Sequence, residues 1–256
     1  MKTTAFSTSQ PEWNIGVKPP GQPLSAAFFE RDAQLVAIDL LGKLLCHRVG
    51  KLWLTAKIIE TEAYYRKEKA SHASLGLTEK RRALFMPPGT IYMYYARGGD
   101  SFNLSCGEPG DAVLIKGAIP WLESPHAEVM IREMAARTPL PSGKPRPHHR
   151  LCSGQTLLCR ALGLRVPQWD RQSLDPERLT VVSHGEPPEK IIRTTRLGIP
   201  QGRDGHLPLR FVDFSNAASA TKNPLTARKT ASPVFEVLTL DNLKARLHPI
   251  GQITAE

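Results

Sequence analysis

The sequence is poor in cysteine, and its cysteines are not spaced for metal binding. Only four occur among 256 residues, without a C-x-x-C pair or the spacing of a zinc site. This pattern favours free, buried thiols in a reducing compartment over disulfides. Nothing in the sequence suggests a metal, and we expect no cofactor.

The sequence also lacks a secretory or membrane signature. Residues 1–23 have none of the charged, apolar and small-residue regions of a signal peptide, and no apolar run could span a bilayer. We therefore expect an intracellular protein, in a bacterial cytoplasm with its nucleoid or in a nucleus, without membrane contact. Residues 1–23 mix Ser, Thr, Pro and Gly, which predicts a flexible N-terminal arm. No linker divides residues 24–256, which we expect to form one domain.

Acidic residues are missing from three long stretches. Residues 134–169, 190–203 and 214–235 contain Lys or Arg but no Asp or Glu, and the whole chain carries a net charge of +10. Three such runs favour a continuous basic face for a polyanion, although each alone is also typical of a solvated surface. A polyanion is therefore the partner that the charge predicts.

The most informative stretch covers residues 58–116. Apolar and β-branched residues from Leu52 onward predict a strand that brings Glu62 and Tyr64 to one side. Aromatic alternation in residues 88–95 predicts a second strand with Tyr92 and Tyr94 on one face, and the glycines at 98–99 predict a hairpin. The combination of an acid, tyrosines and a histidine is typical of a pocket.

The remaining pattern predicts alternating helices and short strands. We expect helices at residues 25–41, from 124 onward, at 153–163 and at 235–247; the helix from 124 should place its methionines in the core, and the one at 153–163 should begin with a Ser153 cap and end at Gly163. Strands are expected at residues 43–49, 52–60, 111–116, 180–183 and 191–195. Residues 77–82 are expected to form a basic loop. The fold class is α+β, with a curved, mainly antiparallel sheet from which the hairpin at residues 94–103 projects.

Several motifs together resemble the alkyladenine DNA glycosylase family, the mammalian-type 3-methyladenine DNA glycosylases. They include VAIDLLGK (36–43), ETEAY (60–64), SHA (71–73), PGTIYMY (88–94), LCSG (151–154), RLGI (196–199) and PLRF (208–211). The resemblance implies one domain and a monofunctional enzyme of base excision repair. Such an enzyme flips an alkylated purine, 3-methyladenine above all, out of duplex DNA and hydrolyses its N-glycosidic bond without a metal.

The resemblance places the general base of this reaction at Glu62. One carboxylate can aim a water at the sugar carbon, accept its proton and stabilise an electron-poor sugar. Glu60 is the competing carboxylate, which we interpret as a supporting residue. A salt-bridged strand end is the alternative interpretation of Glu62.

The resemblance assigns base binding to four residues. Tyr64, His72 and Tyr94 match the family's three stacking residues, and cationic alkylated purines gain from stacking on electron-rich rings. Asn103 matches the asparagine that disfavours the exocyclic amino group of normal guanine. A structural role for His72 and a turn role for Asn103 are the alternatives.

The candidates for DNA contact are less regular, because the hairpin departs from the family pattern. Arg97, or Tyr95 as the next choice, is expected to fill the gap left by the flipped nucleotide. Lys116 stands where the family has an arginine. Ser153 and Gly154 begin a helix whose N-terminus is suited to a phosphate.

The residues leave other functions open. A noncatalytic protein that binds damaged DNA would keep the fold and basic face, and an enzyme of RNA or free nucleosides is a third reading. No lysine occupies an obvious nucleophilic position, so we expect no Schiff base and no strand cleavage. A monomer is expected, and the sequence does not rank hypoxanthine, 7-methylguanine and ethenoadenine as substrates.

Overall fold

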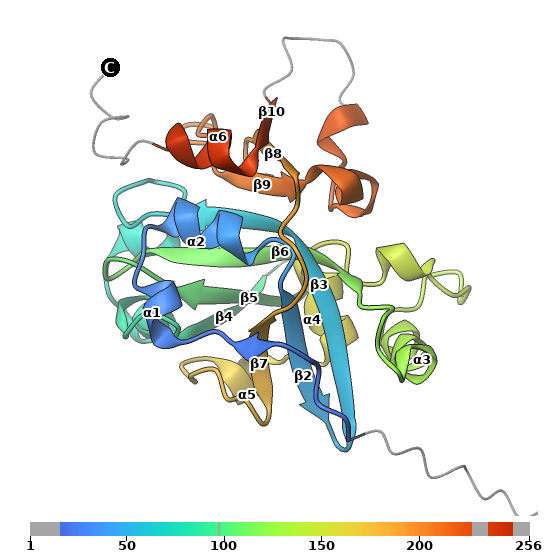
Figure 1. The fold of residues 1–256 in the computed structure, drawn as a ribbon. Helices are drawn as coiled ribbons and strands as arrows, with labels where there is room; N and C mark the ends of the chain where they lie inside the picture. The colour runs from blue at the N-terminus through green and yellow to red at the C-terminus, as the bar shows by residue number, and fades with distance from the viewer. Residues whose placement is uncertain (1–15, 97, 227–234, 248–256) are drawn as a thin grey trace, which may run out of the picture.

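The fold is built on one large antiparallel sheet with helices packed against it (Figure 1). The computed structural model describes residues 16–96, 98–226 and 235–247. The main path of the sheet runs β1-β7-β2-β3-β6-β5-β4, while β9 pairs with β3 and leads to β8 and β10. Its strands are Gln22–Pro23 (β1), Leu44–Val49 (β2), Leu52–Tyr64 (β3), Ile91–Ala96 (β4), Gly99–Ser105 (β5), Ala112–Pro120 (β6), Leu179–Ser183 (β7), Lys190–Thr194 (β8), Arg210–Asp213 (β9) and Phe235–Thr239 (β10).

Helices are short and connect the strands. The α-helices are Ala26–Phe29 (α1), Ala33–Leu40 (α2), Ala127–Arg137 (α3), Gln155–Leu162 (α4), Val166–Trp169 (α5) and Leu240–Ala245 (α6). The 3-10 helices are His72–Leu75 (η1), Glu79–Phe85 (η2), His148–Arg150 (η3), Phe214–Ser219 (η4) and Pro224–Thr226 (η5). Helices and an antiparallel sheet in one assembly confirm the α+β class, and the register of β4 with β5 confirms the hairpin.

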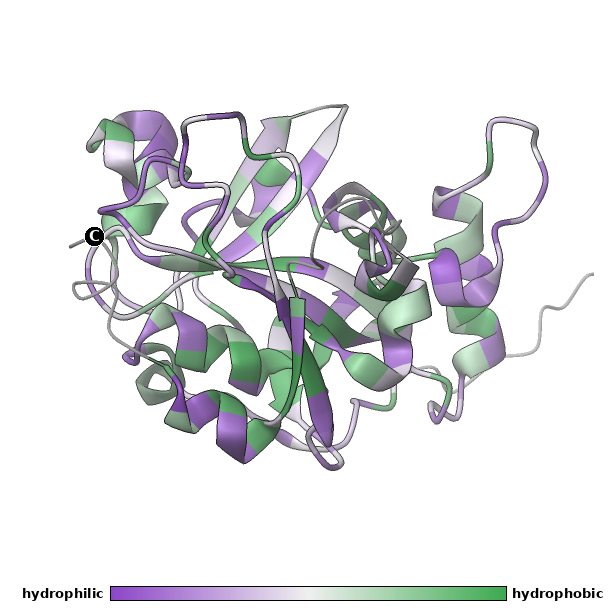
Figure 2. Ribbon diagram, turned by 90° about the horizontal axis from the view of Figure 1, so that it is seen from above, coloured by the Kyte–Doolittle hydropathy of each residue, from purple (hydrophilic) through white to green (hydrophobic). Residues whose placement is uncertain are grey.

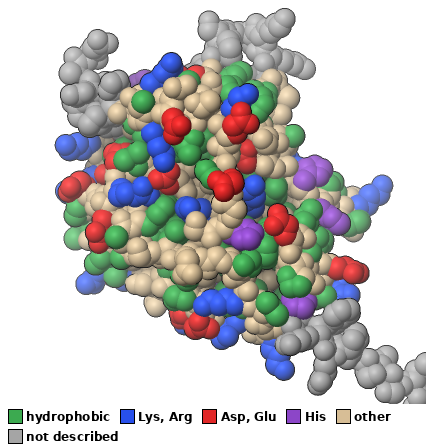
Figure 3. All heavy atoms as spheres, viewed as in Figure 1, with side chains coloured by type: hydrophobic (Ala, Val, Ile, Leu, Met, Phe, Trp, Pro, Cys, Tyr) green, Lys and Arg blue, Asp and Glu red, His purple; other side chains and the backbone are tan. Residues whose placement is uncertain are grey.

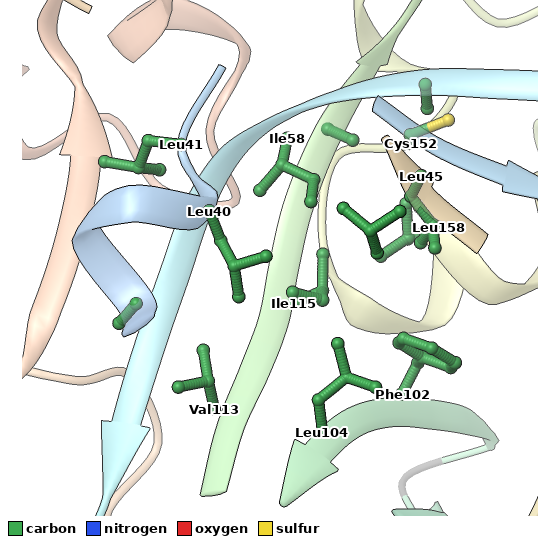
Figure 4. Packing of buried hydrophobic residues seen from close by; sticks show 14 of the residues in the cluster. Leu40, Leu41, Leu45, Ile58, Phe102, Leu104, Val113, Ile115, Cys152 and Leu158 are labelled. Atoms are coloured by element: carbon green, nitrogen blue, oxygen red, sulfur yellow. The ribbon is translucent and has the colours of Figure 1, made fainter. Parts of the chain in front are cut away.

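The two faces of the central strands carry residues of different parts of the protein. A row of directly paired residues on one face, Ala63, Val113, Leu104 and Ile91, belongs to the main hydrophobic core. Figure 4 shows Leu104, Phe102 and Ile115 beside α4, with Val113 on the side of β6 toward Leu40 of α2. The neighbouring row is Glu62, Leu114, Asn103 and Tyr92, on the opposite face because side chains alternate along a strand. The pleat therefore separates the core from the candidate site.

Helices α3 and α4 are amphipathic, whereas α2 is buried at six of its eight residues. Figure 2 shows apolar residues on the sides of the helices that meet the sheet and polar residues on their outer sides. In α3 the buried residues are Met130 and Met134, which confirms that these methionines belong to the core. Gly163 ends α4 with a φ of 70°, a left-handed conformation that glycine adopts without strain.

Two predicted helices were wrong in part. The range 25–41 holds two helices, because Asp32 caps a new one by accepting hydrogen bonds from the backbone N–H groups of Gln34 and Leu35. In the range 235–247 the first half is strand β10, which finds its partner in β8, and only α6 is helical. In the predicted loop at 77–82, the residues from Glu79 onward belong instead to η2, which buries Ala83 and Leu84.

The end of the predicted arm has a defined structure. Gln22–Pro23 pair with Ser183 and Val182 of β7, at the edge of the sheet. Residues 1–15 lie outside the described part of the chain. All four cysteines are free and buried, as predicted, and burial raises the pKa of the Cys46 and Cys152 thiols to about 12.

Candidate functional site

The site is a cavity on the face of the sheet opposite the main core. Its volume is about 360 Å³, which suits a small planar ligand. Its walls come from strands β3 to β6, from η1 and α4, and from the loop before β9. The lining includes four predicted base-binding residues and one predicted DNA-contact residue: Tyr64, His72, Tyr94, Asn103 and Lys116.

Glu62 lies behind the cavity wall and contacts three residues that line it. Its side chain is 0% exposed. Oε2 accepts a hydrogen bond from the Tyr64 hydroxyl at 2.7 Å, while Oε1 lies 3.4 Å from the Lys116 ammonium and accepts one from the Leu197 backbone N–H at 3.2 Å. A carboxylate oxygen has two acceptor positions. Among the described residues Oε2 therefore has one position left.

Tyr64 is held as a hydrogen-bond donor. Its pKa is raised well above the ordinary value, because the phenol is buried and the Glu62 carboxylate stands beside it. The Arg196 guanidinium lies over the ring, 4.5 Å from its centroid, and pairs with buried Glu68. Arg196, predicted on the basic face, is 4% exposed and supports the site from inside.

The other rings form a second aromatic wall. His72 and Tyr94 meet edge to face with centroids 4.6 Å apart, and Tyr92 lies 5.5 Å from Tyr94. His72 Nδ1 shares a hydrogen bond of 2.9 Å with the Tyr92 hydroxyl. The pKa of His72 is lowered, first by its partial withdrawal from water and then by Arg81 and Arg203, so its ring is neutral at neutral pH.

Asn103 faces the cavity from the strand next to β4. Its Nδ2 donates to the Tyr92 carbonyl at 3.0 Å, and the residue is 5% exposed. The side chain is thus fixed within the sheet, in contrast to the turn role considered from the sequence. Its carboxamide oxygen accepts no hydrogen bond from the described residues.

The predicted DNA-contact residues do not share one surface. Lys116 is only 7% exposed and lines the cavity, although the sequence showed no lysine in an obvious nucleophilic position. Ser153 is buried, and its hydroxyl donates to the Ser219 and Ala220 carbonyls instead of capping α4. Gly154 takes the N-cap position with a φ of 99°. Tyr95 is 68% exposed, and Arg97 lies outside the described residues.

A β-bulge explains the position of Lys116. Between Glu60 and Thr61 the partners on β6 move from Gly117 to Ile115, which leaves Lys116 as the extra residue. A bulge locally twists a strand and redirects a side chain. Lys116 Nζ also donates to Gln155 Oε1 at 2.9 Å, and Gln155 Nε2 donates to the Ser101 hydroxyl at 2.7 Å.

Glu60 stands two residues before Glu62, and neither Glu60 nor its partners Arg210 and Thr221 line the cavity. Its Oε1 accepts from Arg210 Nε at 2.7 Å, and its Oε2 accepts from the backbone N–H and hydroxyl of Thr221 at 2.7 and 2.8 Å. These contacts bind β3 to β9 and to the segment after η4. This geometry agrees with the supporting role expected for Glu60.

Sequence reasoning missed part of the lining. Gln155 comes from the start of α4, Arg203 and the residues 197–200 come from the loop between β8 and β9, and Leu75 comes from η1. The RLGI motif at 196–199 was a signal for that loop, but no motif marked Gln155. The pairing of Arg196 with Glu68 spans 128 positions and leaves no local trace in the sequence.

Charge on the surface is mixed on one side of the molecule. Figure 3 shows Lys, Arg, Asp and Glu side chains interspersed over the visible face, so a continuous basic track does not lie on that side. Within residues 16–96, 98–226 and 235–247, no three His, Cys, Asp or Glu side chains gather as metal ligands. No helix of this described part is long and apolar enough to cross a membrane.

Comparison with known proteins gives a consistent result. The family model described as "Methylpurine-DNA glycosylase (MPG)" matches residues 27–217. A protein of Pseudomonas aeruginosa (strain LESB58) is 56% identical over 220 residues, covering 86% of this chain and 92% of its own. One from Pseudomonas savastanoi pv. phaseolicola is 62% identical over 77% and 89% of the two chains, and one from Methanoculleus marisnigri is 36% identical over 73% and 93%. All three carry the name "Putative 3-methyladenine DNA glycosylase".

Proposed function

Because the chain belongs to the methylpurine-DNA glycosylase family, we propose that it hydrolyses the N-glycosidic bond of alkylated purines in duplex DNA. The family and the names of the relatives support a DNA glycosylase for alkylated bases. 3-Methyladenine is the substrate we place first, and the product is an abasic site in an uncut strand. The observation that carries the proposal is a buried carboxylate, Glu62, that contacts Tyr64, Leu197 and Lys116, three residues lining an aromatic cavity.

Glu62 is the general base of the proposed reaction. A water bound at the remaining acceptor position of Oε2 is aimed at the sugar carbon of the flipped nucleotide. As its oxygen bonds to that carbon, the carbon–nitrogen bond breaks, its electron pair leaves with the purine, and the water proton passes to Glu62. The hydrogen bonds from Tyr64 and Leu197 hold the carboxylate still during this step.

The aromatic walls select the base. His72 and Tyr94 already contact each other edge to face, so a purine fits between this pair on one side and Tyr64 on the other. Electron-poor alkylated purines gain about 0.5–2 kcal/mol from such a ring, more than normal bases do. A neutral His72 adds no repulsion toward a cationic base. Asn103 presents its amide within the same cavity, where it can oppose the amino group of guanine.

The flipped nucleotide requires contacts outside the cavity. Tyr95, exposed at the end of β4, is the described hairpin residue suited to enter the gap in the base stack. The acid-free stretches supply the cations for the phosphates, and the salt dependence of binding measures how many take part.

Replacing Glu62 by Gln tests the proposal. Single-turnover release of base from duplexes carrying one hypoxanthine, ethenoadenine or 7-methylguanine should fall by ~10²-fold or more, because Gln cannot accept the proton. Binding to abasic-site DNA should persist. Equal rates for both proteins would remove Glu62 from its role.

If wild-type protein binds damaged duplex but releases no base, the protein is instead a noncatalytic damage binder. Circular dichroism and thermal unfolding of both proteins show whether a lost rate reflects lost fold. Comparison of duplex DNA with single-stranded RNA as competitors, across a range of salt, tests the choice of nucleic acid.

Because Lys116 lines the cavity, the expectation that the DNA strand stays uncut requires its own test. A Schiff base needs an unprotonated amine, whereas the Lys116 amine donates to Gln155 and faces the Glu62 carboxylate. We expect borohydride to trap no covalent complex with damaged duplex. A trapped complex that disappears in K116M would make the enzyme bifunctional.

A further inference from the structure

We propose that Gln155, supported by Ser101, is a positioning residue that holds the Lys116 ammonium against Glu62. The inference deepens the proposed function and rests on it. Gln155 stands at the first position of α4, and both ends of its carboxamide are occupied. Its oxygen accepts from Lys116 at 2.9 Å, and its nitrogen donates to Ser101 at 2.7 Å.

The orientation of the carboxamide is set by its partners. Lys116 is a pure donor, so it requires the oxygen of Gln155, and the nitrogen then needs an acceptor. The Ser101 hydroxyl, 0% exposed on β5, supplies that acceptor. A Gln155 rotated by half a turn would place its NH₂ group against the ammonium and lose the hydrogen bond from Lys116.

Lys116 needs such support because of its side chain and its place in the strand. It is the extra residue of a β-bulge, and its flexible aliphatic stem does not fix the ammonium by itself. The distance from Nζ to Glu62 Oε1 is 3.4 Å, an ion pair without a tight hydrogen bond. The shorter contact to Gln155 therefore decides where the charge stands.

The consequence for chemistry concerns the use of Glu62 Oε1. With Lys116 and the Leu197 N–H on Oε1, the oxygen left for a water is Oε2. If Lys116 swings away, Oε1 also becomes open, and the water loses its single defined position. Placement errors of about 1 Å at a reacting centre can lower a rate by about 10²-fold. Gln155 thus acts on the rate through another residue and is not itself a catalytic group.

A double-mutant cycle tests this role. We expect Q155L to lower the single-turnover rate of base release at saturating enzyme by about 10-fold, with little change in the affinity for abasic-site DNA. K116M should lower the rate further, and adding Q155L to K116M should then have almost no effect. S101A should follow Q155L with a smaller loss.

Q168L is the matched control, because it makes the same Gln-to-Leu substitution at an exposed position on α5. Three results would overturn the inference: an unchanged rate in Q155L, an equal loss in the K116M background, or weaker DNA binding at an unchanged saturated rate. The last would make Gln155 a contact of the base itself. If the wild-type protein releases no base from any lesion, the proposed function fails instead, which separates the two failures.

Discussion

Two buried glutamates on the same strand show how differently one side chain can be used. Both acceptor oxygens of Glu60 face groups that cannot leave, namely Arg210 and Thr221, and the carboxylate joins three segments of the fold. Glu62 instead has Tyr64 and Lys116, which also line the cavity, and keeps an acceptor position for water. Burial is equal, at 0% exposure for both. The two acids therefore differ in their partners: those of Glu60 join segments of the fold, whereas Tyr64 and Lys116, the partners of Glu62, also line the cavity.

The largest expected effect on stability comes from replacing Glu60. E60Q should lower the free energy of unfolding by about 3–5 kcal/mol, because Arg210 is left as a buried charge without its counter-ion. E62Q should lower the free energy of unfolding by less, because Lys116 keeps Gln155 as a hydrogen-bond acceptor. Denaturant unfolding of both variants measures the difference.

E177Q is the control for that comparison, since Glu177 pairs with Lys18 at the surface and its loss should change stability by about 1 kcal/mol or less. Our assignment of the two glutamates reverses if E60Q unfolds like wild type while E62Q does not fold.

A smaller effect is expected at Gly117, which faces Glu60 across the strands. A Cβ added there would lie 2.8 Å from Glu60 Oε2, closer than real contacts allow. G117A should therefore destabilise the protein by about 1–3 kcal/mol. G205A, where the nearest atom to an added Cβ is 3.4 Å away, should be close to neutral in the same thermal unfolding assay.

Asp111, just before β6, sharpens the comparison because it is a buried acid that forms no ion pair with any described residue. Burial raises its pKa to about 6, against which the hydrogen bond from the Arg66 N–H is a weaker, opposing influence. A raised carboxyl pKa means that the folded state binds the proton more tightly than the unfolded state. The contribution of Asp111 to stability therefore falls as pH rises from about 4 to about 6.

D111N should remove this pH dependence. Relative to wild type, the variant should gain about 1–2 kcal/mol between pH 4 and pH 7, as followed by melting temperature across pH. A constant difference between the two proteins at all pH values would contradict the assignment of the shift to Asp111.

The sequence was informative wherever a regular period decided the outcome. Period two along β3 and β4 correctly placed Glu62 with Tyr64 and Tyr92 with Tyr94. It could not place Lys116, because a bulge depends on the pairing of two strands and breaks the period. The helix break at Asp32 also escaped, since apolar spacing continued across a cap.

Longer-range features escaped for a different reason. Arg196 looked like surface charge, and only the folded chain brings Glu68 beneath it. Strand β10 has no recognisable pattern until β8 lies beside it. The motifs shared with a family located the cavity, while Gln155, which lies outside those motifs, could be interpreted only from its two hydrogen bonds.

The branching of the sheet at β3 limits how this chain can vary. Residues 60–62 are bonded to β6 on one side and to β9 on the other, so both neighbours fix where each of them stands. Inserting or deleting a single residue upstream in β3 would turn the Glu62 side chain toward the hydrophobic core and that of an aliphatic neighbour toward the cavity. Length changes should therefore be tolerated in the connecting loops and eliminated by selection within this strand.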